Sequence, residues 1–215
     1  MSMMKRLLRR ALTLPAAMVC ALSVPITAAQ AALVTYSFTG MTDGSSPLPV
    51  FGAFQFDNAT SGSGGVYNGA VKGFSLTIGG YTSSFTPGIN GVKISLSSDL
   101  GGGLSGDRWT LVSAATGPQL GGTVPFYFDL HLDRQGGGLF ANAALQDPPS
   151  FGSLSEARWR LFFEGAHGTP FASIGSITHL TAVPLPPAVL LFGAGLIALV
   201  GLGAGGLSNL RRPQS

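Results

Sequence analysis

Two carboxylates and an imidazole alternate along one stretch of the chain, from Phe126 to Asp133. In an extended strand, successive side chains point to opposite faces, so Asp129, His131 and Asp133 share a face at spacings of about 7 Å. Such a face can ligate a metal or carry out acid–base chemistry. The alternative, which we favour, is a solvated outer face. The opposite, apolar face would then hold Phe126, Phe128, Leu130 and Leu132.

A second group of carboxylates flanks a glycine-rich segment. Asp99 and Asp107 lie on either side of Leu100 to Gly106, which we predict to be a flexible loop. Ca²⁺ takes oxygen ligands, and glycines let loop carbonyls converge, so this segment could hold the ion. It lacks the DxDxDG order of a calcium-binding loop, and we favour aspartates that cap the loop. We therefore predict no metal or cofactor; the candidate ligands are Asp99, Asp107, Asp129 and Asp133.

Aromatic side chains offer a third chemistry, stacking on a sugar ring. The candidates are Trp109, Trp159, Tyr67, Tyr81 and Tyr127. If they line one exposed face, the domain is a carbohydrate-binding module. However, Trp159 shares strand parity with Leu161 and Phe163, and Trp109 shares it with Leu111. We therefore predict that both tryptophans pack in the core.

Sequence motifs of common enzymes are missing. There is no GxSxG or HExxH motif, and the histidines at 131, 167 and 179 show no ligand spacing. A GxGxxG match at 201–206 lies in an apolar span, with no strand before it. We predict a non-enzymatic protein. A secreted hydrolase, the less favoured alternative, would need Asp129, His131 or Asp133 in a cleft with a second acidic group.

The body of the chain, residues 32–182, shows period-two alternation in short runs separated by glycines and prolines. We read Gly79-Gly80 and Asn90-Gly91 as tight turns, and Leu139 to Leu145 as the only candidate for a short helix. No repeat period is present. The pattern predicts one all-β domain, a β-sandwich of jelly-roll-like topology. The predicted strands cover about 34–39, 54–56, 74–78, 81–85, 92–96, 108–113, 126–132, 157–164 and 174–182.

Charge is distributed unevenly along the chain. All nine acidic residues lie in the body, which carries six of the twelve basic residues and thus a net charge of −3. This sign does not favour a nucleic-acid partner. The only cysteine, Cys20, precedes the body, so disulfides, thiolate metal sites and cysteine nucleophiles are excluded from it. The other basic residues are Lys5, Arg6, Arg9, Arg10, Arg211 and Arg212.

The C-terminal end contains twenty consecutive uncharged residues, Ala188 to Leu207. As a helix this run is about 30 Å long, enough to span a bilayer. Arg211 and Arg212 follow it, and the positive-inside rule places them in the cytoplasm. An ordinary transmembrane anchor would fit these features, but a proline block, Val183-Pro184-Leu185-Pro186, precedes the run.

The order of these parts resembles the PEP-CTERM sorting signal in its VPLP variant. The matching residues are Val183, Pro184, Leu185, Pro186, Phe192, Gly193, Gly195, Arg211 and Arg212. The resemblance implies that an exosortase, a membrane-embedded cysteine transpeptidase, recognises the tail and cleaves near the proline block. It also implies a cargo associated with extracellular polysaccharide and biofilm.

The N-terminal end is typical of a secretory signal peptide. Basic residues precede an apolar run, and Ala29-Gln30-Ala31 suits signal peptidase. We therefore predict a signal peptide at 1–31, an exported domain at 32–182, and a sorting signal at 183–215 with a transmembrane helix at 188–207. We expect an exported protein of a Gram-negative bacterium. The helix would hold it transiently in the inner membrane, and it would then reach the cell surface or the extracellular matrix. Its expected partners are signal peptidase, exosortase and polysaccharide.

Overall fold

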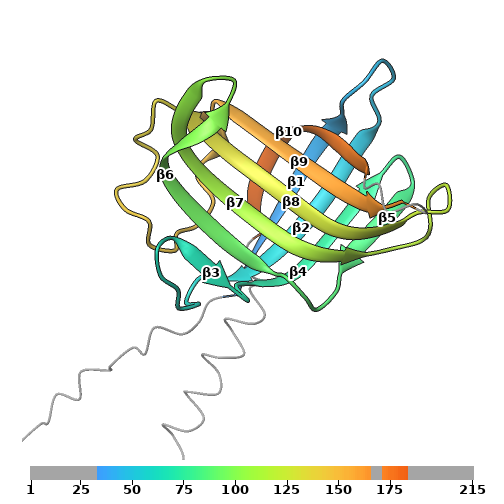
Figure 1. The fold of residues 1–215 in the computed structure, drawn as a ribbon, viewed down its shortest axis with the longest axis horizontal. Helices are drawn as coiled ribbons and strands as arrows, with labels where there is room; N and C mark the ends of the chain where they lie inside the picture. Colours follow the sequence, from blue (N-terminus) through green and yellow to red (C-terminus); the bar gives the residue numbers. More distant parts are fainter. Residues whose placement is uncertain (1–32, 166–170, 184–215) are drawn as a thin grey trace, which may run out of the picture. The chain divides into compact units, whose positions relative to one another are not determined.

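A computed structural model describes residues 33–165 and 171–183 (Figure 1). These residues form an all-β domain, as predicted, in which ten antiparallel strands are hydrogen-bonded into one sheet. The predicted signal peptide and the predicted span at 188–207 lie outside the described residues. Within those residues, no helix has the length and apolar character needed to cross a membrane.

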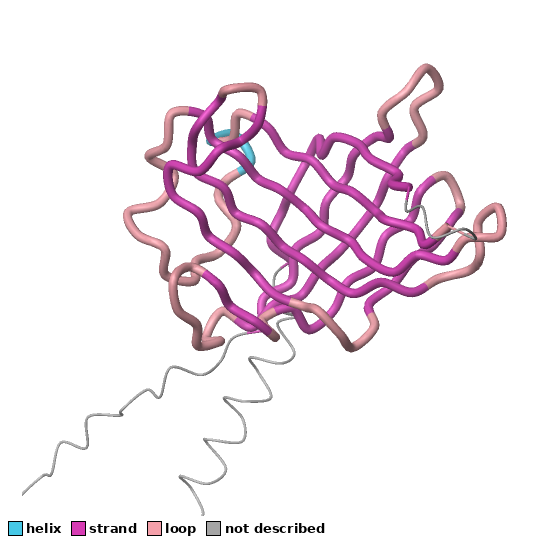
Figure 2. The backbone as a smooth tube through the Cα atoms, viewed as in Figure 1, coloured by secondary structure: helices cyan, strands magenta, loops and turns pink. Residues whose placement is uncertain are grey.

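The strands are joined mostly by short turns (Figure 2). In chain order, the elements are β1 (Leu33–Thr42), β2 (Pro49–Asp57), β3 (Val66–Asn68), β4 (Val71–Ile78), β5 (Tyr81–Phe85), β6 (Gly91–Gly101), β7 (Leu104–Thr116), β8 (Val124–Gln135), the 3-10 turn η1 (Phe151–Ser153), β9 (Glu156–Glu164) and β10 (Phe171–Val183).

The sheet closes on itself. Its order is β3-β6-β7-β5-β4-β2-β1-β10-β9-β8, and β8 also pairs with β7. Apart from β3 and β6, which extend from the edge of β7, neighbouring strands follow one another along the chain. The jelly-roll-like connectivity that we predicted differs from this meander. Part of the reason is local, because tight glycine turns, such as Gly79-Gly80 with φ of 54° and 108°, fold β5 back on β4 and β7 back on β6.

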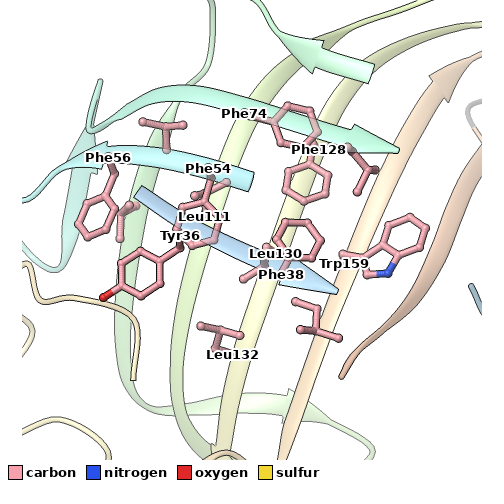
Figure 3. Close-up of a cluster of buried hydrophobic side chains, with 14 of the residues drawn as sticks. Tyr36, Phe38, Phe54, Phe56, Phe74, Leu111, Phe128, Leu130, Leu132 and Trp159 are labelled. Atoms are coloured by element: carbon pink, nitrogen blue, oxygen red, sulfur yellow. The ribbon is translucent and has the colours of Figure 1, made fainter. Parts of the chain in front are cut away.

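The core lies between two crossing layers, with β6 to β9 over β1, β2 and β4 (Figure 1). Aromatic rings from the two layers meet there, as Figure 3 shows. The ring centroids of Phe74 and Phe128 are 4.2 Å apart, and those of Phe54 and Trp109 are 5.9 Å apart. Pairs of this kind contribute about 0.5–1.5 kcal/mol beyond the burial of their surface. Packing of aromatic side chains thus holds the layers together.

The first and last strands of the domain complete the sheet. β1 pairs with β10 from Thr35 opposite Val183 to Thr42 opposite Gly175, with a bulge after Thr39. Two glycines permit the close approach of these backbones. A Cβ on Gly40 would overlap the carbonyl oxygen of Ser176, and one on Gly175 would overlap the carbonyl oxygen of Met41 and press on the Trp159 ring.

Three local predictions were wrong. Asp99 to Gly106 is a hairpin between β6 and β7 that turns at Gly102-Gly103, not a flexible loop. Asn90-Gly91 is not a tight turn, because Gly91 begins β6 opposite Val112. Leu139 to Leu145 is irregular rather than helical.

The irregular segment is held by core side chains from the neighbouring strands. Tyr67 donates its hydroxyl to the Ala143 carbonyl at 2.7 Å, and Trp109 donates its indole N–H to the Gln146 carbonyl at 3.1 Å. These hydrogen bonds satisfy backbone carbonyls that a helix would satisfy internally. Tertiary contacts therefore override the weak local preference for a helix.

We predict that Gly175→Ala destabilises the domain, because the added Cβ meets backbone and the Trp159 ring with no room to move. The free energy of unfolding should fall by about 1–3 kcal/mol. Gly152→Ala is the matched control, since its Cβ would meet nothing within 4 Å. Urea titration of both variants tests the prediction, and equal midpoints would contradict it.

Candidate functional site

Three of the polar side chains that the sequence singles out, Asp129, His131 and Asp133, lie on the outer face of β7, β8 and β9. We call this surface the charged face. The cross-strand register aligns four rows on it: Arg108, Asp133 and Glu156; Thr110, His131 and Arg158; Val112, Asp129 and Arg160; and Ala114, Tyr127 and Phe162.

Asp129 and Asp133 are not solvated, contrary to our expectation of a solvated outer face. They are only 3% and 4% exposed, because arginines from the neighbouring strands lie across them. Arg108 donates from Nε and Nη2 to Asp133, both at 2.7 Å. Arg160 donates to Asp129 in the same way, at 2.8 and 2.6 Å. Bidentate pairs of this kind occupy both carboxylate oxygens, which leaves them poorly suited to bind a metal or accept a proton.

His131 lies between the two ion pairs as a neutral side chain. Burial lowers its pKa below the ordinary value, and the cations of Arg108 and Arg160 add to this effect, although the charges of Asp129 and Asp133 oppose it. Arg160 Nη2 lies 3.4 Å from His131 Nε2. Since a guanidinium only donates, this ring nitrogen is the acceptor. His131 thus contributes to the polar contacts between β8 and β9 through its Nε2 atom.

Asp99 and Asp107 have separate structural roles. Asp107 is buried and accepts backbone N–H groups from Ser97 at 3.0 Å, Leu139 at 2.9 Å and Phe140 at 3.3 Å. Asp99 accepts the N–H of Gly101 within its own hairpin at 2.8 Å. Asp107 therefore binds the irregular part of β6 at Ser97 and fixes the segment at Leu139 and Phe140 to the sheet.

The part of the chain that the structure describes contains no cluster of metal ligands. No group of three or more His, Cys, Asp or Glu side chains is placed there to hold an ion. The candidate calcium site between Asp99 and Asp107, the alternative that we did not favour, thus has no such set of ligands among the described residues.

The aromatic platform that we considered as an alternative use of the Trp and Tyr side chains is not formed by the tryptophans or by Tyr67. Trp109 and Trp159 are both fully buried, which confirms the prediction that they belong to the core, and Tyr67 is buried as well. The indole N–H of Trp159 has no hydrogen-bond partner among the described residues. These side chains cannot stack on an external ligand.

A different aromatic group, which the sequence analysis missed, lies at one end of the charged face. The rings of Phe126, Tyr127 and Phe162 lie 5.5–6.4 Å apart, and the Arg160 guanidinium is 5.3 Å from the Phe162 centroid. We call these three rings the aromatic cluster. Phe126 was predicted to face inward but is 43% exposed, because the register shifts between Pro125 and Tyr127. Pro125 was the available signal, since proline in a sheet favours a bulge.

A shallow hollow of about 390 Å³ opens between β9, β10 and η1. Its polar side chains pair with one another. Arg158 binds Asp43 at 2.8 Å and Glu156 at 3.3 Å, and all three are about half exposed. The hollow therefore presents matched charges to solvent rather than an unsatisfied site.

Val183 is the one residue of the predicted sorting signal that the structure describes. It is the last residue of β10, lies opposite Thr35, and is 43% exposed. The other predicted signal residues lie outside the described ranges. They are Pro184, Leu185, Pro186, Phe192, Gly193, Gly195, Arg211 and Arg212.

Comparisons with known proteins do not identify this chain. No family model, no curated protein and no solved structure matches it. The functional argument therefore depends on the residues and their geometry.

We predict that Arg108→Met lowers the free energy of unfolding by about 3–5 kcal/mol, because it leaves the Asp133 carboxylate buried without its counter-ion. Arg158→Met is the matched control. Its pairs are solvent-exposed, so the cost should stay below about 1 kcal/mol. Denaturant titration at neutral pH compares the two, and equal losses would contradict the role assigned to Arg108.

The stabilising role of the Asp107 carboxylate can be tested by lowering the pH. Burial alone would raise its pKa, but backbone N–H donors outweigh burial and lower the pKa below the ordinary value. The carboxylate thus stabilises the fold above the unfolded-state pKa, about 3.9, and this contribution is lost as the pH falls further. Asp107→Asn should therefore lose less stability than the parent below about pH 4. Parallel pH profiles in thermal unfolding would contradict this prediction.

Proposed function

We propose that the chain is an exported, non-enzymatic cargo protein of the PEP-CTERM type. It is sorted and processed by an exosortase and becomes a component of the cell surface or extracellular matrix. The observation that carries the proposal is the position of Val183, where the described sheet meets the predicted sorting signal. Val183 pairs with Thr35 as part of β10, and Pro184, the first proline of the block, is the next residue of the chain.

This boundary suits a cleavable tail. Hydrogen bonds between β1 and β10 complete the sheet before Pro184 is reached. Cleavage within or after the block Pro184 to Pro187 would remove no residue from a described strand. Proline carries no backbone N–H, so the prolines at 184, 186 and 187 offer no donors with which to continue the sheet. The domain can thus remain intact after the tail is cut.

The chemistry of the described residues also supports a non-enzymatic role. The carboxylates that the sequence offers for catalysis are bound by arginines or by backbone N–H groups. A secreted hydrolase would need one of them free beside a second acid. For the fold, we propose a flattened two-layer sandwich with meander connectivity, supported by the ring contacts between β2 or β4 and the opposite layer.

A carbohydrate-binding module is the second candidate function. The tryptophans do not favour it, but exposed phenylalanines on outer faces of the sheet do: Phe51 is 57% exposed and Phe126 is 43% exposed. Exposed aromatic rings provide stacking surfaces for ligands with an apolar face. The two candidates are compatible, since a matrix protein can act by binding polysaccharide.

We predict that Pro184→Ala with Pro186→Ala blocks processing. In a host that carries an exosortase, the parent should appear in the outer or extracellular fraction, shortened by roughly the mass of the tail. The double variant should stay membrane-bound at full length, because the substitutions leave the apolar span untouched but remove the extended block. Immunoblots of cell fractions measure both properties.

Leu196→Arg with Val200→Arg is the control for insertion. Each arginine costs about 2.5–3.5 kcal/mol at the middle of the span and should release unprocessed protein. If the parent and the proline variant have the same size and the same fraction, the tail is an ordinary anchor.

A further inference from the structure

The outer face of the other layer has a different chemistry from the charged face. We call it the hydroxyl face. Cross-strand register across β10, β1, β2, β4 and β5 sets three rows on it: His179, Thr39, Phe51, Thr77 and Thr82; Thr181, Ser37, Ala53, Ser75 and Ser84; and Val183, Thr35, Gln55 and Gly73.

These three rows contain no Asp, Glu, Lys or Arg, although the charged face carries all of these except lysine. Charged residues begin at the edge of the face, where Asp57 pairs with Leu33 in the next row and exposed Lys72 precedes Gly73. Threonine is favoured in strands, but serine is not among the residues that strands favour, and Ser37, Ser75 and Ser84 are all exposed. The face is thus both polar and uncharged.

The geometry of the face is regular. Neighbouring strands lie about 4.8 Å apart, and side chains on one face repeat roughly every 6.8 Å along a strand. Phe51 lies on the middle strand, between Thr39 and Thr77 in its row and beside the small Ala53. At 57% exposed, its ring is more accessible than that of Phe126. The face therefore presents one apolar ring within an array of hydroxyls.

Most of these hydroxyls are available to a ligand. The Thr35 hydroxyl accepts from Gln55 at 3.1 Å, and that of Thr39 contacts Thr178 and His179. Others make no hydrogen bond within the described residues, namely those of Ser37, Ser75, Thr77, Thr82, Ser84 and Thr181. A hydroxyl both donates and accepts. Sugar hydroxyls have the same capacity, so the two surfaces complement each other without charge.

We propose that the hydroxyl face binds an extended, uncharged polysaccharide, with a sugar ring stacked on Phe51 and its hydroxyls bonded to the flanking Ser and Thr side chains. This inference rests on the proposed function in one respect: export places the domain outside the cell, where it can meet polysaccharide. Within its three rows the face has no Lys or Arg to bind an anionic polymer or lipid headgroup, with Lys72 only at the edge, and apart from Phe51 its apolar side chains are few. A neutral polyhydroxylated chain is the partner whose charge and hydrogen-bonding match it.

Depletion from solution by insoluble polysaccharide tests the proposal. The full chain, kept in a detergent without a sugar headgroup, is mixed with cellulose, an insoluble β-1,3-glucan, or chitin. At least one should bind it, with equal affinity at about 0.05 M and about 0.5 M NaCl, because no ion pair is formed. Alginate, an anionic polysaccharide, should compete poorly.

Variants locate the site. Phe51→Ser should weaken binding at least about tenfold, or about 1.4 kcal/mol, and Thr77→Glu should weaken it similarly, whereas Phe51→Tyr keeps the ring and should retain binding. Phe126→Ser is the matched control, because it removes an exposed ring from the charged face. Thermal midpoints verify folding, which exposed substitutions should leave nearly unchanged.

Several results would overturn the proposal. These are no binding to any of the three polysaccharides, salt-sensitive binding to alginate alone, or a loss caused by Phe126→Ser and not by Phe51→Ser. A two-chain mass in sedimentation that Phe51→Ser reduces to one would assign the face to a second copy of the chain. Phe51→Ser should leave tail processing unchanged. If the tail is not processed but the chain still binds polysaccharide, only the sorting proposal is rejected. If the tail is processed but the chain binds no polysaccharide, only the binding proposal is rejected.

Discussion

The hydrogen bonds between β1 and β10 are the constraint on which the rest of this structure depends. They turn a meander with two free edges into a closed sheet, and only a closed sheet encloses the aromatic core. Closure requires two backbones to approach where no Cβ fits, at Gly40 and Gly175. It also decides where both ends of the domain leave, because Thr35 and Val183 lie opposite each other.

Closure also gives the domain two outer faces with opposite chemistry. On one, arginines cover carboxylates that are almost fully buried, so charge serves the stability of the sheet. On the other, uncharged hydroxyls surround a single exposed ring. In a buried ion pair the charges already neutralise each other, and breaking the pair to bind a ligand costs free energy. Exposed hydroxyls can exchange a hydrogen bond to water for one to a ligand at little cost. We therefore propose that the charged face stabilises the sheet and that the hydroxyl face binds a ligand.

Local patterns in the sequence predicted the all-β class, most strands and the burial of both tryptophans, because alternation and glycine turns act over a few residues. Non-local contacts decided the rest. The sequence alone predicts that Asp129 and Asp133 are solvated. Only the cross-strand register shows that Arg160 and Arg108 lie across them. One bulge after Pro125 turned Phe126 outward. The hydroxyl face could not be recognised either, since its rows combine residues from five strands that only the register aligns.

The pairing of the first strand with the last also sets an order of events during biosynthesis. A ribosome makes β1 early and β10 last, and contacts such as Thr39 with Thr178 join positions 139 residues apart. Until β10 emerges, the edges of β1 and β9 stay open, a condition in which strands readily pair with the wrong partner. Such long-range closure is slow to form. We therefore expect chains that stop short of β10 to aggregate more readily than the complete domain, because the edges of β1 and β9 stay unpaired in them.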